Sequence, residues 1–154
     1  MASANPEFTI ELLRERVLTG PDGSGRNFPA DLGVEPIEIT DERSVGRMPI
    51  DGRHLHPGGF VHGGAWVGLA DSVAAWQTFR HIEPGANFTT IEMKLNVFSA
   101  GRAGDELVAT AEHLHAGRST QVVEVRVRRE QRLVGNLVVT QFVLPAPEPG
   151  DEDL

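Results

Sequence analysis

Residues 64–80 read GAWVGLADSVAAWQTFR and form the most apolar segment of the chain. At helical spacing their apolar side chains leave almost no polar face: Trp66, Val67, Leu69, Ala70, Val73, Ala74 and Trp76. A helix that is apolar around most of its circumference is a buried one. Gly63 and Gly64 mark its start and Arg80 marks its end, so the sequence predicts one long helix inside the core.

Strand-like segments lie on both sides of this helix in the sequence. Two short ones, residues 32–39 and 44–50, precede it and follow a first helix with apolar periodicity over residues 9–18. Four longer ones follow it at a spacing of roughly 10–12 residues. They cover residues 88–98, 105–115, 120–129 and 133–144. The short turns between these four predict an antiparallel meander.

This order of elements defines the expected architecture. One helix has to be covered by an antiparallel sheet that curves around it, which is the outline of an α+β hotdog fold, here with an extra N-terminal helix. We expect residues 1–29 to hold that helix and a loop, residues 30–144 to form the hotdog domain, and residues 145–154 to be an acidic, disordered tail. A single sheet around one helix has an open edge, so a second copy of the chain is expected to pair with it.

The composition argues against several classes of function. The 154 residues contain 14 Lys and Arg against 22 Asp and Glu, and the resulting net charge of −8 argues against nucleic-acid binding. There is no cysteine, which excludes disulfides, thiolate metal sites and cysteine nucleophiles and fits a cytoplasmic protein. No apolar run reaches the roughly 18–20 residues of a membrane span, and the N-terminus lacks the pattern of a signal peptide.

The start of the central helix carries the first chemical signal. Gly63 and Gly64 place uncrowded backbone N–H groups at the positive end of the helix dipole, where a developing anion is stabilised. An N–H group aimed at a carbonyl oxygen is a component of an oxyanion hole. The other interpretation is a tight turn without a chemical role.

Asp71 carries the second signal, because it interrupts the most apolar helix of the chain. A carboxylate there is unfavourable for helix propensity and for solvation, which favours a role as base or nucleophile. The alternative is a structural carboxylate bonded to Ser72 or Thr90. Gly63 and Asp71 are eight residues apart, about 12 Å along a helix axis, which is too far for both to serve one carbonyl. If both are catalytic, the site requires two antiparallel copies of the chain.

Residues 56–71, HPGGFVHGGAWVGLAD, resemble the hotdog acyl-CoA thioesterases of the PaaI-like and 4-hydroxybenzoyl-CoA thioesterase-like family. The signature of that family reads N/Q-x-x-G-x-x-H-G-G-x-x-x-x-L-x-D/E, and its spacing is intact here. The matching positions are His56, Gly59, His62, Gly63, Gly64, Leu69 and Asp71. The resemblance covers about residues 30–144 and implies hydrolysis of an acyl-CoA to the free acid and CoA.

The resemblance also implies roles for single residues. Asp71 would be the nucleophile or general base, the Gly63 N–H of the partner subunit would polarise the thioester carbonyl, and His62 would support the loop and orient the thioester. His56 stands where the family has Asn or Gln; a neutral imidazole donates one hydrogen bond, as an amide can, but it also titrates. The expected substrate-binding residues are Gly64, Thr90, Trp76, Lys94, Arg102, Arg118, Ser119 and Thr120.

Neither a cofactor nor a metal is expected. His54 with His56, and His113 with His115, pair imidazoles without the fixed helical spacing of known zinc motifs. Two other functions remain open: a hotdog enoyl-CoA hydratase or dehydratase, which pairs an Asp with a His, and a non-catalytic acyl-CoA-binding protein. Aryl, phenylacetyl and medium-chain acyl groups are all open as substrates. The resemblance favours a homotetramer built from two dimers.

Overall fold

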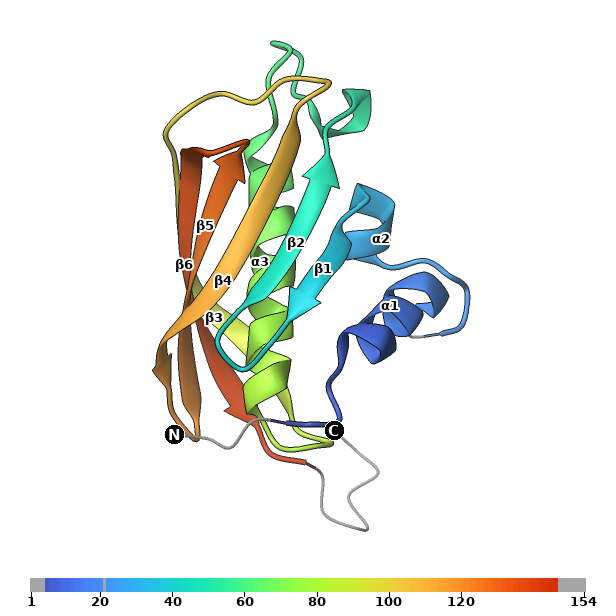
Figure 1. The fold of residues 1–154 in the computed structure, drawn as a ribbon, viewed down its shortest axis with the longest axis vertical. Coiled ribbons are helices and arrows are strands. Elements are labelled where there is room, and N and C mark those ends of the chain that lie inside the picture. Colours follow the sequence, from blue (N-terminus) through green and yellow to red (C-terminus); the bar gives the residue numbers. More distant parts are fainter. Residues whose placement is uncertain (1–4, 21, 147–154) are drawn as a thin grey trace.

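The computed structural model describes residues 5–20 and 22–146. The elements are, in chain order, α1 (Ile10–Thr19), α2 (Phe28–Leu32), β1 (Glu35–Ile39), β2 (Ser44–Pro49), the 3₁₀ turn η1 (Gly52–His54), α3 (Gly63–His81), β3 (Asn87–Val97), β4 (Glu106–Ala116), β5 (Thr120–Arg129) and β6 (Arg132–Leu144). The six strands form one antiparallel sheet that curves around α3, as Figure 1 shows. This is the hotdog fold that the sequence predicts, with the N-terminal helix beside it.

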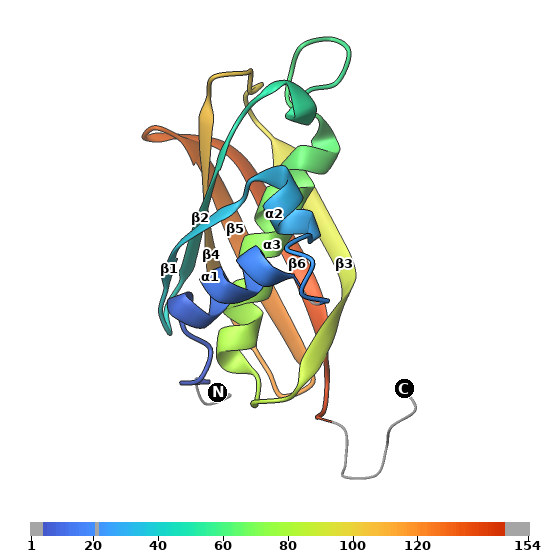
Figure 2. The same ribbon diagram turned by 90° about the vertical axis from the view of Figure 1, so that its right-hand side faces the viewer.

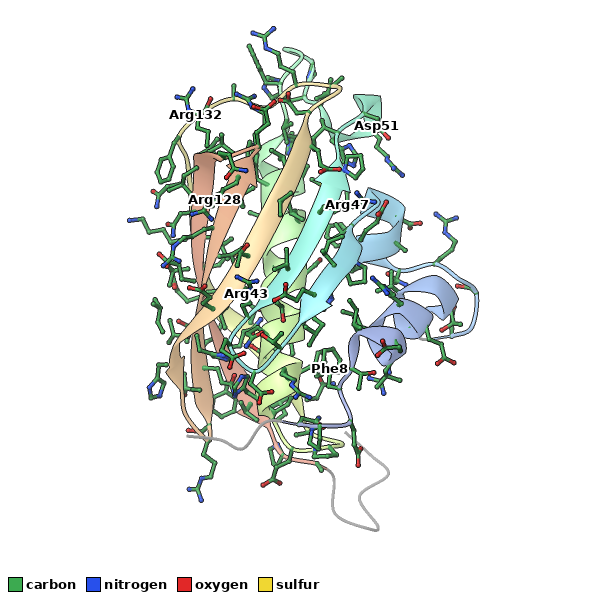
Figure 3. The ribbon with its side chains drawn as sticks, viewed as in Figure 1. Phe8, Arg43, Arg47, Asp51, Arg128 and Arg132 are labelled. Carbon is green, nitrogen blue, oxygen red and sulfur yellow. The ribbon has the colours of Figure 1, made fainter. Side chains whose placement is uncertain are left out.

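The concave face of the sheet and α3 bury one another. Val123, Val125 and Val127 of β5 are fully buried, because alternate residues of a strand point to the same face. Leu69 and other apolar residues of α3 pack against them in one cluster. Phe8, at the lower end of the molecule in Figure 3, belongs to the same cluster, so the N-terminal segment shares the core of the hotdog domain.

The strand order differs from the predicted meander. Of the four strands predicted to form the meander, only β4, β5 and β6 follow one another as neighbours; β3 pairs with β6, and β4 pairs with β2, which gives the order β1-β2-β4-β5-β6-β3. The connection over residues 98–105 therefore crosses one end of the sheet (Figure 1). Val61 N–H donates to Gly101 C=O and Ile50 N–H donates to Asp105 C=O, which fixes this connection. The physical reason lies in burial: alternate residues of β4 are buried, as in a central strand, whereas most of β3 is exposed.

The strand predicted over residues 32–39 begins three residues later than expected, because the short helix α2 ends at Leu32. Asn27 caps α2 with its side chain, and Pro29 occupies the first turn, where its missing N–H costs nothing. Gly33 ends the helix in the left-handed region with φ 72°. The strand itself begins at Glu35. A five-residue helix is too short to show a helical period in the sequence, which is why it was missed.

The two edges of the sheet are unequal. β1 is five residues long, contains Pro36 and packs beside α1. β3 is 11 residues long and, within the described part of the chain, has a strand partner only on its β6 side. Large exposed apolar side chains lie on or next to it: Ile91, Met93, Val97 and Phe98. A long exposed edge strand of this kind is a template for pairing with another chain.

The convex face of the sheet is charged. Arg43, Arg47 and Arg128 extend from this face in Figure 3. Arg47 pairs with Glu35 at 2.7 Å and Arg43 with Glu38 at 2.7 Å. Exposed pairs of this type contribute about 0.2–1 kcal/mol each. β3, in contrast, combines an edge left unpaired by the described strands with exposed apolar side chains. The acidic tail predicted over residues 145–154 lies, beyond Ala146, outside the described residues.

A polar cluster is enclosed where the C-terminal end of α3 meets the sheet. Ser44 Oγ donates to Gln77 Oε1 at 2.7 Å, and both side chains are fully buried. His113 Nε2 donates to Gln121 Oε1 at 2.6 Å, and its ring meets the ring of His81 edge-on, with 4.5 Å between centroids. Burial lowers the pKa of His113 to about 4, because the charged imidazolium is poorly solvated there. The folded protein therefore keeps this ring neutral.

The free energy of unfolding is expected to fall as the pH is lowered from about 6.5 to about 4. In that window the unfolded chain binds a proton at residue 113 and the folded chain does not, so protons favour the unfolded state. The loss is at most about 3 kcal/mol at the acidic end. Thermal unfolding between pH 7 and 4.5 measures it, and His113→Gln should flatten the slope. Parallel slopes for the two proteins would assign the acid sensitivity to other groups.

Candidate active site

The loop before α3 is shaped by glycines and by its own histidines. Gly59 has φ 82°, a backbone conformation that favours glycine, and its N–H donates to His56 C=O at 2.9 Å. His62 is the N-cap of α3 in place of the usual Ser, Thr, Asp or Asn. Its imidazole Nδ1 accepts a hydrogen bond from Gly64 N–H at 2.9 Å. The loop is thereby fastened to the first turn of the helix.

This cap leaves one N–H group at the head of α3 without an acceptor. His62 C=O accepts from Ala65 N–H and from Trp66 N–H, and the His62 ring accepts from Gly64 N–H. Gly63 N–H has no acceptor among residues 5–20 and 22–146. A Cβ placed at Gly63 would have no atom within 4 Å, so the space around this residue is open. Gly63 therefore presents a free, accessible donor at the positive end of the helix dipole.

His56 is held with one ring nitrogen directed inward. Its Nδ1 accepts a hydrogen bond from Gly58 N–H at 2.9 Å. In the neutral ring the proton consequently resides on Nε2, which is left as a donor. His56 and Gly63 line the same open cavity of about 440 Å³, together with Phe60, Val61, Trp66, Val97, Phe98, Ser99 and Ala100. Two hydrogen-bond donors thus belong to one apolar cavity.

Asp71 lies two turns further along α3, on the half-exposed stripe that also contains Gly64, Val67 and Ala75. Burial raises the pKa of this carboxyl above its ordinary value, and a hydrogen bond from Thr90 opposes the shift. Thr90 Oγ1 donates to Asp71 Oδ1 at a long 3.5 Å. The carboxylate is thus poorly solvated and weakly bonded, which is the state of a reactive base.

The remaining predicted substrate-binding residues are dispersed. Trp76 is 4% exposed and packs under β2, so the structure gives it a core position rather than a pocket position. Lys94 is exposed on β3, opposite Val138 and turned away from α3. Gly64 has its N–H engaged by His62. Arg102 lies over the ring of Phe60, 4.7 Å from its centroid, next to the cavity at the head of α3.

Arg118, Ser119 and Thr120 lie at the other end of α3. Arg118 and Ser119 line a second cavity of about 850 Å³ between the end of α3, the β4–β5 turn and the end of β6. Thr120 closes the turn by accepting Gly117 N–H through its backbone C=O at 3.0 Å. The structure therefore separates three groups of predicted residues along α3: the head, the middle and the far end.

Sequence reasoning missed the apolar residues of the cavity at the head of α3. Phe60 is inside the signature segment but not at a signature position, and Phe98 follows β3 on the crossing connection. Their shared cavity depends on the strand order, which local sequence does not carry.

Between residues 5 and 146, position 21 excepted, no three His, Asp or Glu side chains gather as a metal site would require.

Comparisons with known proteins agree with this geometry. The sequence profile of the thioesterase superfamily matches residues 58–136. The putative esterase ComA2 of Bacillus subtilis (strain 168) is 36% identical over 101 residues, which cover 65% of this chain and 79% of that protein. The 1,4-dihydroxy-2-naphthoyl-CoA hydrolase of Listeria monocytogenes is 31% identical over 99 residues, which cover 64% of this chain and 80% of that protein.

The structural match to a solved thioesterase covers nearly the full length of both chains. The crystal structure of thioesterase HI1161 from Haemophilus influenzae superposes with a TM-score of 0.82 at 24% identity, over 97% of this chain and 99% of that one. None of the helices in the described ranges has the length and apolarity needed to cross a bilayer. The profile spans the head of α3, Asp71 and the strands through Asn136, just over half of the chain. The chain belongs to the thioesterase superfamily and is a hotdog-fold thioester hydrolase.

Proposed function

We propose that the protein hydrolyses acyl-CoA thioesters at a site built by two copies of the chain. Asp71 of one copy would act as base or nucleophile, and Gly63 N–H of the other would polarise the thioester carbonyl. The observation that carries this is a pair of groups on one helix: a free N–H at Gly63 and a half-buried, weakly bonded carboxylate at Asp71. They lie about 12 Å apart along the axis, so they cannot meet within one chain.

The chemical steps follow from these groups. The thioester oxygen accepts hydrogen bonds from Gly63 N–H and from His56 Nε2–H, both of which border one cavity. The Asp71 carboxylate removes a proton from a water that attacks the carbonyl carbon, or attacks that carbon itself and is released by water. The tetrahedral intermediate then collapses, the C–S bond breaks, and the CoA thiolate leaves and takes up a proton. The donors stabilise the negative oxygen of that intermediate.

The open edge of β3 supports the two-copy site. Antiparallel pairing of β3 with β3 of a second copy would satisfy the exposed edge and bury its apolar side chains. It would also place the Val97 end of one strand beside the Asn87 end of the other, and so the head of one α3 toward the middle of its partner's. Two such dimers would form the homotetramer.

The CoA moiety fits the far cavity of the same chain. Ten residues, or about 15 Å of helix, separate Asp71 from His81, which lines that cavity. Arg118 offers a cation and Ser119 a hydroxyl there, groups that bind phosphate. The Listeria relative is named for a CoA thioester, which agrees with this assignment.

The position of His56 argues against the hydratase alternative. A hydratase of this fold would use the imidazole as an acid or base, whereas here Nδ1 is already engaged by Gly58 N–H and the neutral ring keeps its proton on Nε2. Release of free thiol from an acyl-CoA, measured with a thiol reagent, tests hydrolysis directly. Loss of enoyl absorbance without thiol release would support the hydratase instead, and tight binding with neither reaction would support the binding protein.

Replacement of His56 should show whether its donated hydrogen bond or its imidazole ring itself is needed for hydrolysis. His56→Ala is expected to lower kcat/KM about 10²-fold, the usual effect of losing one oxyanion donor. His56→Gln, which offers an amide N–H, should recover most of that loss. Thiol release over pH 5–9 measures both. A glutamine variant as inactive as the alanine variant would show that His56 acts through its ring and not through a donated hydrogen bond.

A further inference from the structure

The short helix α2 lies against the face of α3 that the sheet does not cover, as Figure 2 shows. The contact is at Gly68. A Cβ at this position would lie 2.4 Å from Leu32 Cδ1 and 3.1 Å from Phe28 Cε1. A side chain at position 68 would therefore have to displace Leu32 or Phe28, whose tips rest on the surface of α3.

This contact is next to Asp71. Gly68 precedes Asp71 by three residues and follows Gly64 by four, and residues at these spacings are neighbours on a helix surface, about 5–6 Å apart. Thr90 of β3 bonds to Asp71 from the other flank of α3. The carboxylate is therefore bonded to β3, and the ring of Phe28 contacts α3 one turn before it, at Gly68.

Phe28 is exposed although it is anchored. Its residue surface is 64% accessible, the highest value among the large apolar residues of the described chain, while Leu32 beside it is half-buried. On β3, Met93 is also exposed and lies on the α3 side of the strand, because it pairs with the fully buried Val139. Exposed apolar groups in the neighbourhood of a half-buried carboxylate are the environment of an apolar substrate.

We propose that Phe28 is a specificity-determining residue that stacks on the acyl group of the thioester and selects planar aromatic acyl groups. This rests on the proposed function, since it places the thioester carbonyl at Asp71. An aryl ring bonded directly to that carbonyl is rigid, and the ring of Phe28, one helical turn from Asp71, is placed to form an offset stack with it. A straight alkyl chain gains no such stack. Residue 28 lies outside the segment matched by the superfamily profile, so the selection belongs to this chain's own N-terminal segment.

The experiment compares benzoyl-CoA with hexanoyl-CoA as probes. The wild-type protein should favour benzoyl-CoA, and Phe28→Ala should lower the ratio of the two kcat/KM values about tenfold, which is the scale of an aromatic pair. Phe28→Leu keeps apolar volume without the ring and should lower the ratio similarly, whereas Phe28→Tyr should retain it. Ile37→Ala, which removes a 43% exposed apolar side chain from β1, is the matched control and should leave the ratio unchanged.

The outcomes are distinct. Equal losses with both probes, or none, would overturn the inference, because the ring would then serve only to pack α2. Dissociation of Phe28→Ala into monomers by sedimentation with an unchanged ratio would overturn it too, by assigning the ring to contact with a second copy. Wild-type activity that Asp71→Asn does not reduce would instead overturn the proposed function, and this inference with it.

Discussion

Asp71→Asn should lower kcat for thioester hydrolysis by about 10²–10⁴-fold, the range expected for loss of a positioned base. Asparagine has nearly the shape of aspartate and can still accept the bond from Thr90, so the loss would reflect the charge and not the packing. Thiol release from benzoyl-CoA and hexanoyl-CoA measures it. Asp31→Asn makes the same change at an exposed carboxylate of α2; it is the matched control and should keep wild-type turnover.

The same substitution should stabilise the protein at neutral pH. Burial raises the pKa of Asp71, so the folded state favours the protonated carboxyl over the charged one. The stability that this group contributes is present at low pH and is lost as the pH rises through the raised pKa. Asparagine carries no charge, so its free energy of unfolding at pH 7 should exceed that of the wild type. Urea unfolding at pH 7 and pH 4 measures the difference, and full activity with unchanged stability would contradict both assignments.

Gly63→Pro should abolish activity to a similar degree, about 10²–10³-fold, because it deletes the N–H group without deleting the helix. Proline is favoured at the first position of a helix, where Gly63 stands. The preceding residue, His62, already has φ −66° and ψ 143°, the conformation that proline requires before it. Gly63→Ala keeps the N–H and has no neighbouring atom to meet, so it is the matched control. Equal activities of the proline and alanine variants would exclude the Gly63 N–H from catalysis.

Mixed dimers test whether the two groups come from different subunits. Asp71→Asn and Gly63→Pro chains are each expected to be inactive alone. A mixed dimer would have one site with both substitutions and one site with neither. It should therefore show about half of the wild-type activity per dimer. Co-expression with two affinity tags isolates this species. A mixed dimer without activity would place Asp71 and Gly63 in the same site of the same chain.

The sequence predicted what is encoded locally. The central helix was expected over residues 64–80 and spans Gly63–His81. It could be predicted because apolar residues occupy most of its circumference, a pattern that is present in the sequence itself. The strand over residues 120–129 was matched residue for residue, since its alternation marks one buried face. The strand order could not be predicted from hairpin turns, because the burial that puts β4 in the centre of the sheet and β3 at its edge arises only when all six strands are assembled.

The candidate site shows the same division. The signature segment placed His56, His62 and Gly63 at the head of the helix, because glycines and a capping residue are read within a few positions. The sequence could not predict which backbone N–H group donates to the His62 ring, since this depends on the rotamer of that side chain. Phe28 carried no signal at all, because its place on α3 follows from the packing of α2 at Gly68, forty residues away in the chain.

The open edge of β3 has a consequence for how the enzyme would behave in dilute solution. If the site exists only where two β3 strands meet, a single chain is folded but cannot turn over substrate. Specific activity would then rise with protein concentration and level off once association is complete. At concentrations well below the dissociation constant the rate would scale with the square of the protein concentration, so that newly made chains stay idle until they find a partner.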